Sequence, residues 1–215
     1  MKIALTATPS VARFAPILWR GRVQAAFELA AELGYDGVEL HLRSSDDIEP
    51  EAVRRGKLGG DQQRDTRRAT MLDCVRECCR LAAAEGITIL LEPLNHYEAD
   101  DLTTLDQAAD MIGELKAPNL KLLADTYHMN IEEVDIAASL RRHAAVLGHV
   151  HLVDSNRQVP GHGHMDMRSI LQALLATGYQ GYVCFEVLPL PDPRRAASDG
   201  IQTVREILAS LMARS

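Results

Sequence analysis

Short apolar runs alternate with longer amphipathic segments along the whole chain. The apolar runs predict strands at residues 3–8, 37–42, 87–91, 120–124, 149–153 and 182–185. The amphipathic segments predict helices at residues 23–33, 66–85, 132–146, 168–176 and 196–212, and one more that follows a capping box formed by Thr104 and Gln107. Such alternation is typical of a parallel sheet whose strands are joined by helical crossovers.

The length of the chain limits how complete a barrel it can form. A (β/α) barrel of eight units takes about 250 residues, or roughly 31 per unit. This chain has 215 residues, and its residues 44–64 are polar, contain glycine and follow no apolar period. We therefore expect an α/β fold of the TIM-type (β/α) barrel kind with about six strands, formed by residues 1–215 as a single domain with a loop at 44–64.

Composition and charge narrow the class of protein. The chain is 47% hydrophobic and 25% charged, so it can bury a large core without disulfides or a structural metal. No apolar run approaches the roughly 18 residues of a membrane span, and the N-terminus lacks a signal-peptide layout. These features predict a cytoplasmic protein with no membrane contact. The formal net charge of −7 argues against nucleic acid as a partner.

The cysteines are Cys74, Cys78, Cys79 and Cys184. Three of them lie close together on a helical pattern, which is a poor layout for disulfides. Cys74 and Cys78 are one helical turn apart and could hold a metal, but no second thiolate pair accompanies them. We interpret all four as buried, reduced thiols.

A residue able to bind a metal stands at or near the end of each of the last four predicted strands. These residues are Glu92, Asp125, His151 and Glu186. The carboxyl ends of parallel strands meet on one face of a barrel, so we expect the four side chains to share a site. Three converging carboxylates repel one another unless a cation lies among them. Three carboxylates with one imidazole favour Mn²⁺, Mg²⁺ or Co²⁺ over metals that prefer thiolates.

Other polar residues near these strand ends have less certain roles. His149 faces the same way as the strand-end histidine and is interpreted as a core residue or as support for a ligand. His128 lies just beyond its strand, where it could reach a substrate oxygen. Residues 160–166 contain two histidines and an aspartate, and we interpret them as a surface loop rather than a second metal site. Glu39 and His41 could line the site or be structural.

Four sequence motifs resemble a known family. Residues 91–98 read L-E-P-L-N-H-Y-E and resemble its L-E-P-L-N-R-Y-E, and residues 125–133 read D-T-Y-H-M-N-I-E-E and resemble its D-T-F-H-M-N-I-E-E. The H-V-H at 149–151 with the N-R and P-G-x-G-x-x-D that follow, and the glutamate after the last strand, complete the pattern. This is the sugar phosphate isomerase/epimerase family with a xylose isomerase-like TIM barrel. The nearest branch holds the ketose 3-epimerases and 5-keto-L-gluconate epimerase, and the resemblance covers about residues 1–43 and 70–212.

The resemblance implies a metal-dependent reaction on a small keto-sugar or sugar acid. It implies that one divalent ion, Mn²⁺ first and Mg²⁺ or Co²⁺ as alternatives, is bound by Glu92, Asp125, His151 and Glu186. It implies that the sugar is held by Glu98, His128 and Arg157. Epimerisation or isomerisation would proceed by proton removal and return through a cis-enediolate, with Glu92 and Glu186 as the acid/base pair. The family also suggests a homodimer.

The chain departs from the family in two places. His96 stands where the family has arginine, which predicts the loss of a salt bridge or a substrate contact. The family's third and fourth barrel strands are missing, which indicates an internal deletion around residues 44–65. Two other functions remain open at this stage. One is a non-catalytic relative with an incomplete pocket, and the other is a metal-dependent phosphodiesterase resembling endonuclease IV.

Overall fold

The computed structural model describes residues 1–8, 16–21, 23–40 and 61–213. Within these ranges the strands are β1 (Lys2–Thr8), β2 (Trp19–Arg20), β3 (Gly37–Leu40), β4 (Ile89–Leu91), β5 (Leu120–Asp125), β6 (Leu147–His151) and β7 (Tyr182–Phe185). The helices are α1 (Val23–Leu33), α2 (Asp61–Ala84), α3 (Leu105–Leu115), α4 (Thr126–Glu132), α5 (Ile136–Arg142), α6 (Met167–Ala176) and α7 (Pro193–Met212).

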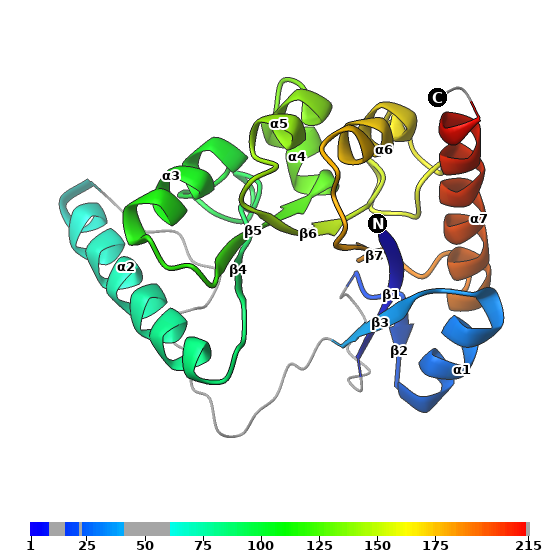
Figure 1. Cartoon of the computed structure of the whole chain (residues 1–215), viewed down its shortest axis with the longest axis horizontal. Helices are drawn as coiled ribbons and strands as arrows, with labels where there is room; N and C mark the ends of the chain where they lie inside the picture. The colour runs from blue at the N-terminus through cyan, green and yellow to red at the C-terminus, as the bar shows by residue number, and fades with distance from the viewer. Residues whose placement is uncertain (9–15, 22, 41–60, 214–215) are drawn as a thin grey trace.

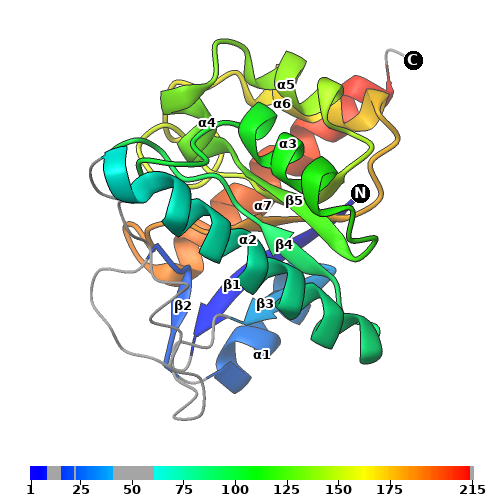
Figure 2. The ribbon, with the colours of Figure 1, turned by 90° about the vertical axis from the view of Figure 1, so that its left-hand side faces the viewer.

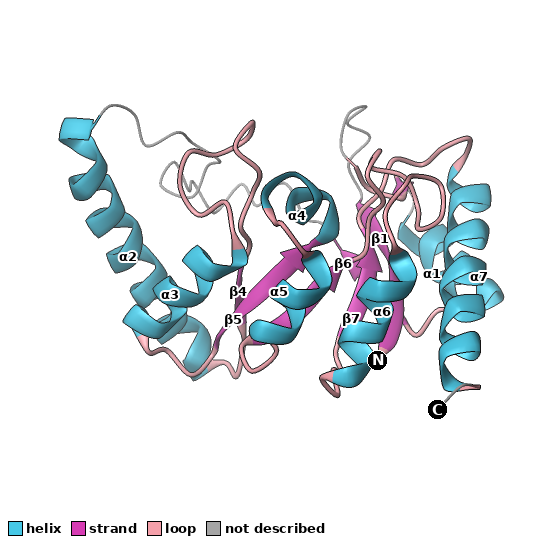
Figure 3. Ribbon diagram, turned by 90° about the horizontal axis from the view of Figure 1, so that it is seen from above, coloured by secondary structure: helices cyan, strands magenta, loops and turns pink. Residues whose placement is uncertain are grey.

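The strands form one curved parallel sheet. Six of them lie in the order β3-β1-β7-β6-β5-β4, and the short β2 pairs with the end of β1. No other described strand pairs with the outer edge of β3 or of β4. In Figure 1 the helices α2, α3, α5, α6 and α7 lie around the outer side of this sheet, and Figure 3 shows the same arrangement from above. The predicted incomplete TIM barrel of about six strands is therefore confirmed as an open half-barrel.

The core lies between the sheet and its helices. Among its largest fully buried side chains are Leu5, Met111, Leu122, Leu171 and Phe185. Complete burial of such a side chain stabilises the fold by about 1.5–3 kcal/mol. This core holds the strands in register, and their register decides which residues meet at the strand ends.

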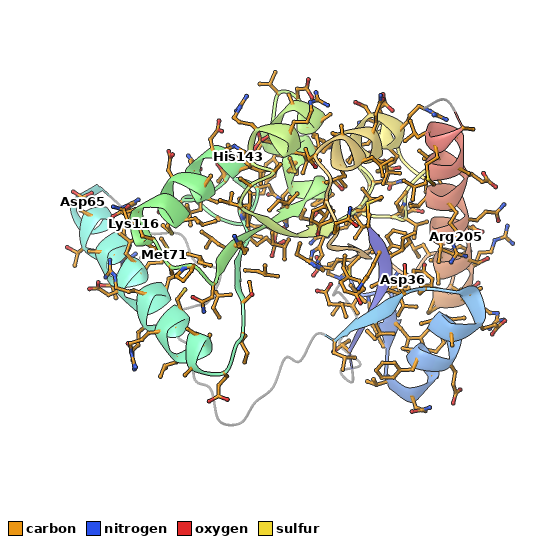
Figure 4. All side chains as sticks on the ribbon, viewed as in Figure 1. Asp36, Asp65, Met71, Lys116, His143 and Arg205 are labelled. Atoms are coloured by element: carbon orange, nitrogen blue, oxygen red, sulfur yellow. The ribbon has the colours of Figure 1, made fainter. Side chains whose placement is uncertain are left out.

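The N-terminal and C-terminal parts of the chain are tied together by polar contacts to the backbone. Asp36 Oδ2 accepts a hydrogen bond of 2.8 Å from the Ile3 amide at the start of β1. Arg205 of α7 donates a hydrogen bond of 3.1 Å to the carbonyl of Leu33, and another to that of Gly34, at the end of α1 (Figure 4). Gly34 has a φ of +75°, which explains why glycine ends this helix. These contacts hold α7 against the end of α1, and the chain that follows α1 against the start of β1.

Several predicted elements have different bounds in the structure. The helix expected at 132–146 is the shorter α5, and α4 before it was not predicted. The two are separate because Glu133 has an extended backbone and the Asp135 side chain caps α5 by accepting a 2.9 Å hydrogen bond from Ala138. The strand expected at 149–153 is shifted towards the N-terminus and ends at His151. Helix α2, which lies along β4 (Figure 2), begins at Asp61 within the predicted loop. The rest of that loop up to residue 60 lies outside the described residues.

Two simpler expectations can also be compared with the structure. None of the described helices is long and apolar enough to cross a membrane. All four cysteines are free, and Cys79 and Cys184 are buried. Cys74 is half-buried and Cys78 is exposed, so the prediction of buried thiols is wrong for Cys78.

Candidate metal and substrate site

The four predicted metal ligands meet at the carboxyl ends of β4, β5, β6 and β7. His151 Nδ1 lies 3.7 Å from Asp125 Oδ2, 3.9 Å from Glu92 Oε1 and 3.9 Å from Glu186 Oε2. Asp125, His151 and Glu186 are buried, and Glu92 is half-buried. Because these strands are hydrogen-bonded neighbours, residues placed at their ends are brought together whatever their separation in sequence. The convergence expected from the sequence is thus present, while the role of each residue remains to be tested.

The donor set fits a divalent cation. Two atoms that each lie about 2.1 Å from one cation can be up to about 4 Å apart, so all three distances to His151 Nδ1 are short enough. Asp125 Oδ2 is buried and has no hydrogen-bond partner among the residues that the structure describes. A buried carboxylate oxygen without such a partner is costly unless a cation neutralises it. Oxygen donors with one imidazole suit Mn²⁺, Mg²⁺ or Co²⁺.

The charges of this cluster are strongly coupled. Burial raises the pKa of Asp125. The imidazoles of His151 and His128 and the guanidinium of Arg157 lower it by more, so the net pKa is below its usual value. Burial lowers the pKa of His151, but the nearby carboxylates of Asp125 and Glu39 raise it by more, so the net pKa is above its usual value. The protein thus stabilises a carboxylate at Asp125 and positive charge at the centre of the cluster. A bound cation would supply the same positive charge.

The Glu39 side chain, from β3, contacts both histidines of β6. Its Oε1 lies 3.2 Å from His151 Nε2, and its Oε2 lies 2.9 Å from His149 Nε2. From the sequence, Glu39 could either line the site or be structural. In the structure it contacts both histidines of the H-V-H motif. A carboxylate on the far nitrogen of a metal-binding histidine fixes the ring and leaves the other nitrogen to the metal. His41 lies outside the described residues.

Glu39→Gln is expected to weaken divalent-metal binding by about 10–100-fold, because an amide cannot replace the carboxylate that holds His151. Isothermal titration with Mn²⁺ measures the change. Glu28→Gln, on the exposed side of α1, is the matched control and should bind as the wild type does. An affinity of the Glu39 variant within twofold of the wild type would contradict the supporting role.

The predicted substrate residues lie beside the predicted metal ligands. His128 Nδ1 lies 3.2 Å from the Asn95 amide nitrogen and 2.7 Å from Asn95 Nδ2, so the ring turns its Nε2 towards Asp125 Oδ2 at 4.0 Å. Arg157 Nη1 donates to Glu98 Oε1 at 3.2 Å, and its Nη2 donates to Glu186 at 3.3 Å. The three predicted residues His128, Glu98 and Arg157 are therefore within one network with the ligands.

Two side chains of this network were not identified from the sequence. The Arg157 guanidinium lies over the Tyr127 ring at 4.5 Å, a cation–π contact that restrains it. Asn95 bonds both His128 and Glu98, the latter at 3.3 Å. Both residues belong to the quoted motifs, and only their place in those motifs could have indicated a role for them. His96, at the family's arginine position, has its Nδ1 2.5 Å from Glu132 Oε1, and the loss of a contact made by the arginine stays a prediction.

The loop after β6 is built around Asp154, which is fully buried. Its side chain accepts hydrogen bonds from the amides of Ser155 at 2.7 Å, Gly161 at 2.9 Å and Met165 at 3.2 Å. Its carbonyl accepts a 2.9 Å bond from Arg157, whose φ of +62° is uncommon for a residue with a side chain. Residues 160–166 form a loop, as predicted, and this loop fixes the backbone from which Arg157 reaches the site.

Gly163→Ala is expected to destabilise the fold by about 1–3 kcal/mol, because a methyl group there would clash with Asp154 Oδ1 and lie 2.5 Å from Ser155 Oγ. Urea denaturation measures the difference. Gly113→Ala is the matched control: nothing lies within 4 Å of the new methyl group, and helix α3 should gain up to about 1 kcal/mol. Equal stabilities for the two variants would show that Asp154 does not organise this loop.

One known protein family matches most of this chain. A family model described as the xylose isomerase-like TIM barrel matches residues 50–207. The chain belongs to this family. The match spans the strands that carry all four predicted ligands, and it confirms the family indicated by the motifs.

Several epimerases are similar to this chain. The 3-dehydro-D-guloside 4-epimerase of Escherichia coli (strain K12) is 37% identical over 142 residues, which is 66% of this chain and 54% of that protein. The D-psicose 3-epimerase of Enterocloster bolteae is 37% identical over 129 residues, which is 60% of this chain and 42% of that protein. The chain thus spans about half the length of these curated relatives.

Solved structures of the same fold are also similar. The apo form of 3-keto-D-glucoside 4-epimerase from E. coli has a TM-score of 0.64 at 31% identity, over 86% of this chain and 70% of that one. The D-allulose 3-epimerase from Methylomonas sp., in complex with D-allulose, has a TM-score of 0.77 at 21% identity, over 96% of each chain. The second likeness supports the barrel fold alone.

Proposed function

We propose that this xylose isomerase-like protein is a divalent-metal-dependent epimerase or isomerase of a keto-sugar or keto-acid sugar. The observation that carries the proposal is the meeting of three carboxylates and one imidazole around His151 Nδ1, beside the guanidinium of Arg157. The similarity to sugar epimerases supports the same class of reaction.

Glu92, Asp125, His151 and Glu186 would hold the cation. Mn²⁺ is our first choice, with Mg²⁺ and Co²⁺ as alternatives, because the donors are mainly hard oxygens. When bound, the cation would supply a Lewis acid that withdraws electron density from the substrate's carbonyl oxygen and acidifies the neighbouring C–H bond.

Glu92 and Glu186 are proposed as the acid/base pair. They follow β4 and β7, the two outer strands of the four that carry the ligands, so they can face a sugar from opposite sides. One carboxylate removes the proton beside the ketone and leaves a cis-enediolate. The other returns a proton to the opposite face, which inverts the carbon. An isomerase would return the proton to the adjacent carbon instead.

Arg157, Glu98 and His128 are proposed to bind the sugar. The Arg157 fork already donates to Glu98 and Glu186, so it can turn one N–H towards a hydroxyl or carboxylate oxygen of the substrate while keeping another partner. His128 has its Nδ1 against Asn95, which leaves its Nε2 on the side of the metal ligands. These contacts would set the orientation of the carbon chain between the two acids.

Solvent exchange tests the proposed chemistry without requiring the product to be known. The chain, loaded with Mn²⁺, is incubated in D₂O with a panel of ketoses and keto-acid sugars, and the carbon next to the ketone is followed by NMR and mass spectrometry. We expect deuterium to enter that carbon of at least one compound. The exchange should stop when the metal is removed by a chelator and resume when it is restored.

A non-catalytic relative is the second candidate, and the open half-barrel favours it. No described strand covers the edges of β3 and β4, so part of the wall around a substrate is absent from the described chain. Stoichiometric metal binding without exchange on any of the sugars would favour this candidate. The absence of metal binding would reject the proposed site itself.

A further inference from the structure

A second group of ligand-type side chains lies one layer below the candidate site. His149 precedes His151 on β6 by two residues, and Cys184 precedes Glu186 by two residues at the end of β7. Side chains two apart on a strand face the same way, so both point to the barrel interior. Interior layers of such barrels are usually filled by valine, isoleucine and leucine. A histidine, a cysteine and Glu39 in this layer therefore need another explanation.

The three side chains are close enough to share an ion. One ligand atom from each of Glu39, His149 and Cys184 lies within 4.8 Å of the other two. The Glu39 Oε2 atom is 2.9 Å from His149 Nε2, whereas its Oε1 faces His151. The two oxygens of one carboxylate thus serve two separate groups.

The burial of the three side chains leaves one side of the group accessible. Cys184 is buried, while Glu39 and His149 are half-buried. No described strand covers the outer edge of β3, so Glu39 is not enclosed from that side by the described chain.

We propose that Glu39 Oε2, His149 Nε2 and Cys184 Sγ form a second cation site, suited to Zn²⁺ or another divalent ion that accepts a thiolate. Sulfur, nitrogen and oxygen donors match zinc, whereas the upper site has no sulfur donor. Binding forms a metal–sulfur bond and releases the thiol proton to solvent. Three protein ligands leave a fourth position for water. The proposal does not depend on epimerase activity.

The shared carboxylate couples the two sites. A cation on Glu39 Oε2 draws negative charge away from Oε1 and weakens its hold on His151. We therefore expect Zn²⁺ at the lower site to reduce the affinity of the upper site for Mn²⁺. The alternative is that Glu39 only accepts hydrogen bonds from His149 and Cys184, in which case no metal–sulfur bond forms.

Cobalt titration distinguishes the two, because a Co²⁺–thiolate bond gives an intense charge-transfer absorption that oxygen and nitrogen ligands do not. The titration uses a chain in which Cys74, Cys78 and Cys79 of α2 are replaced by alanine, since the first two lie one helical turn apart. We expect the band to reach its full height within two equivalents of Co²⁺ per chain, because the upper site also takes up Co²⁺, and to be displaced by Zn²⁺. Cys184→Ser should abolish it, and His149→Gln should weaken Co²⁺ binding at this site at least tenfold.

Two controls separate this result from the other proposals. Asp125→Asn, which removes an upper ligand, should leave the band intact. Circular dichroism of each variant shows whether it is folded. If the triple variant is not folded, the difference between the Co²⁺ spectra of the native chain and of its Cys184→Ser variant gives the same band. A folded protein that shows no thiolate band with excess Co²⁺, or a band that survives Cys184→Ser in the triple background, would overturn the second site.

Discussion

Glu186→Gln is expected to lower the exchange of the substrate proton by about 10²–10⁴-fold, the range that a positioned general acid or base contributes. Glutamine keeps the size of the side chain and can still accept from Arg157, whose Nη2 lies 3.3 Å from Glu186 Oε2. It cannot take up or release the proton. Glu92→Gln should give a loss of similar size, because the two acids act on opposite faces of one carbon.

The measurement is the initial rate of deuterium incorporation at saturating Mn²⁺, together with the metal content by elemental mass spectrometry. At saturating metal, a lower rate reflects the loss of the group that carries the proton and not a weaker affinity for the metal. Glu114→Gln on α3, where the native side chain pairs with Arg68 at 3.0 Å on the surface, is the control and should keep the full rate. A Glu186 variant that retains more than a tenth of the wild-type rate would refute its role as acid or base.

Asp125→Asn is expected to weaken Mn²⁺ binding by more than about 100-fold. Loss of a residue that merely orients a ligand costs 10–100-fold, and Asp125 would be a ligand itself. Its side chain also caps α4, since Oδ1 accepts a 2.7 Å hydrogen bond from Tyr127. Asparagine caps helices as well as aspartate does, so the substitution removes the charge of Oδ2 with little effect on the helix.

Asp135→Asn provides the matched control, because Asp135 caps the neighbouring helix α5 in the same way at the surface. Isothermal titration should show wild-type Mn²⁺ affinity for that variant. Thermal unfolding without metal should give similar midpoints for both variants. Equal metal affinities for the two would mean that Asp125 is only a helix cap.

The sequence was most informative where a residue's position along a strand determined its place in the fold. Apolar runs located the strands that end near Glu92, Asp125 and Glu186, and the parallel topology then brought these ends together. Helix α2 was harder to delimit because its first residues, such as Gln62 and Gln63, are polar and leave no amphipathic period. The break between α4 and α5 depends on a single cap at Asp135.

Contacts between side chains of different strands could not be predicted from the sequence. Glu39 lies 110 residues from His149 in the chain, and nothing local indicates that they bond. Asn95 and His128 are likewise brought together only because β4 and β5 pair. Asp154 reads as an ordinary loop residue, whereas the structure buries it as the centre of the loop that carries Arg157.

The strands β4, β5, β6 and β7, which carry the four proposed ligands, are consecutive neighbours, and the open side of the described half-barrel lies between β3 and β4. The proposed metal-binding end therefore comes from one continuous stretch of the sequence, and the connection from Leu40 to Asp61 carries none of the four proposed ligands. Grafting (β/α) units of about 31 residues into that connection would rebuild the substrate-facing wall without touching this stretch. If the proposed function holds, substrate preference could thus be engineered by insertion while the proposed metal-binding end is left as it is.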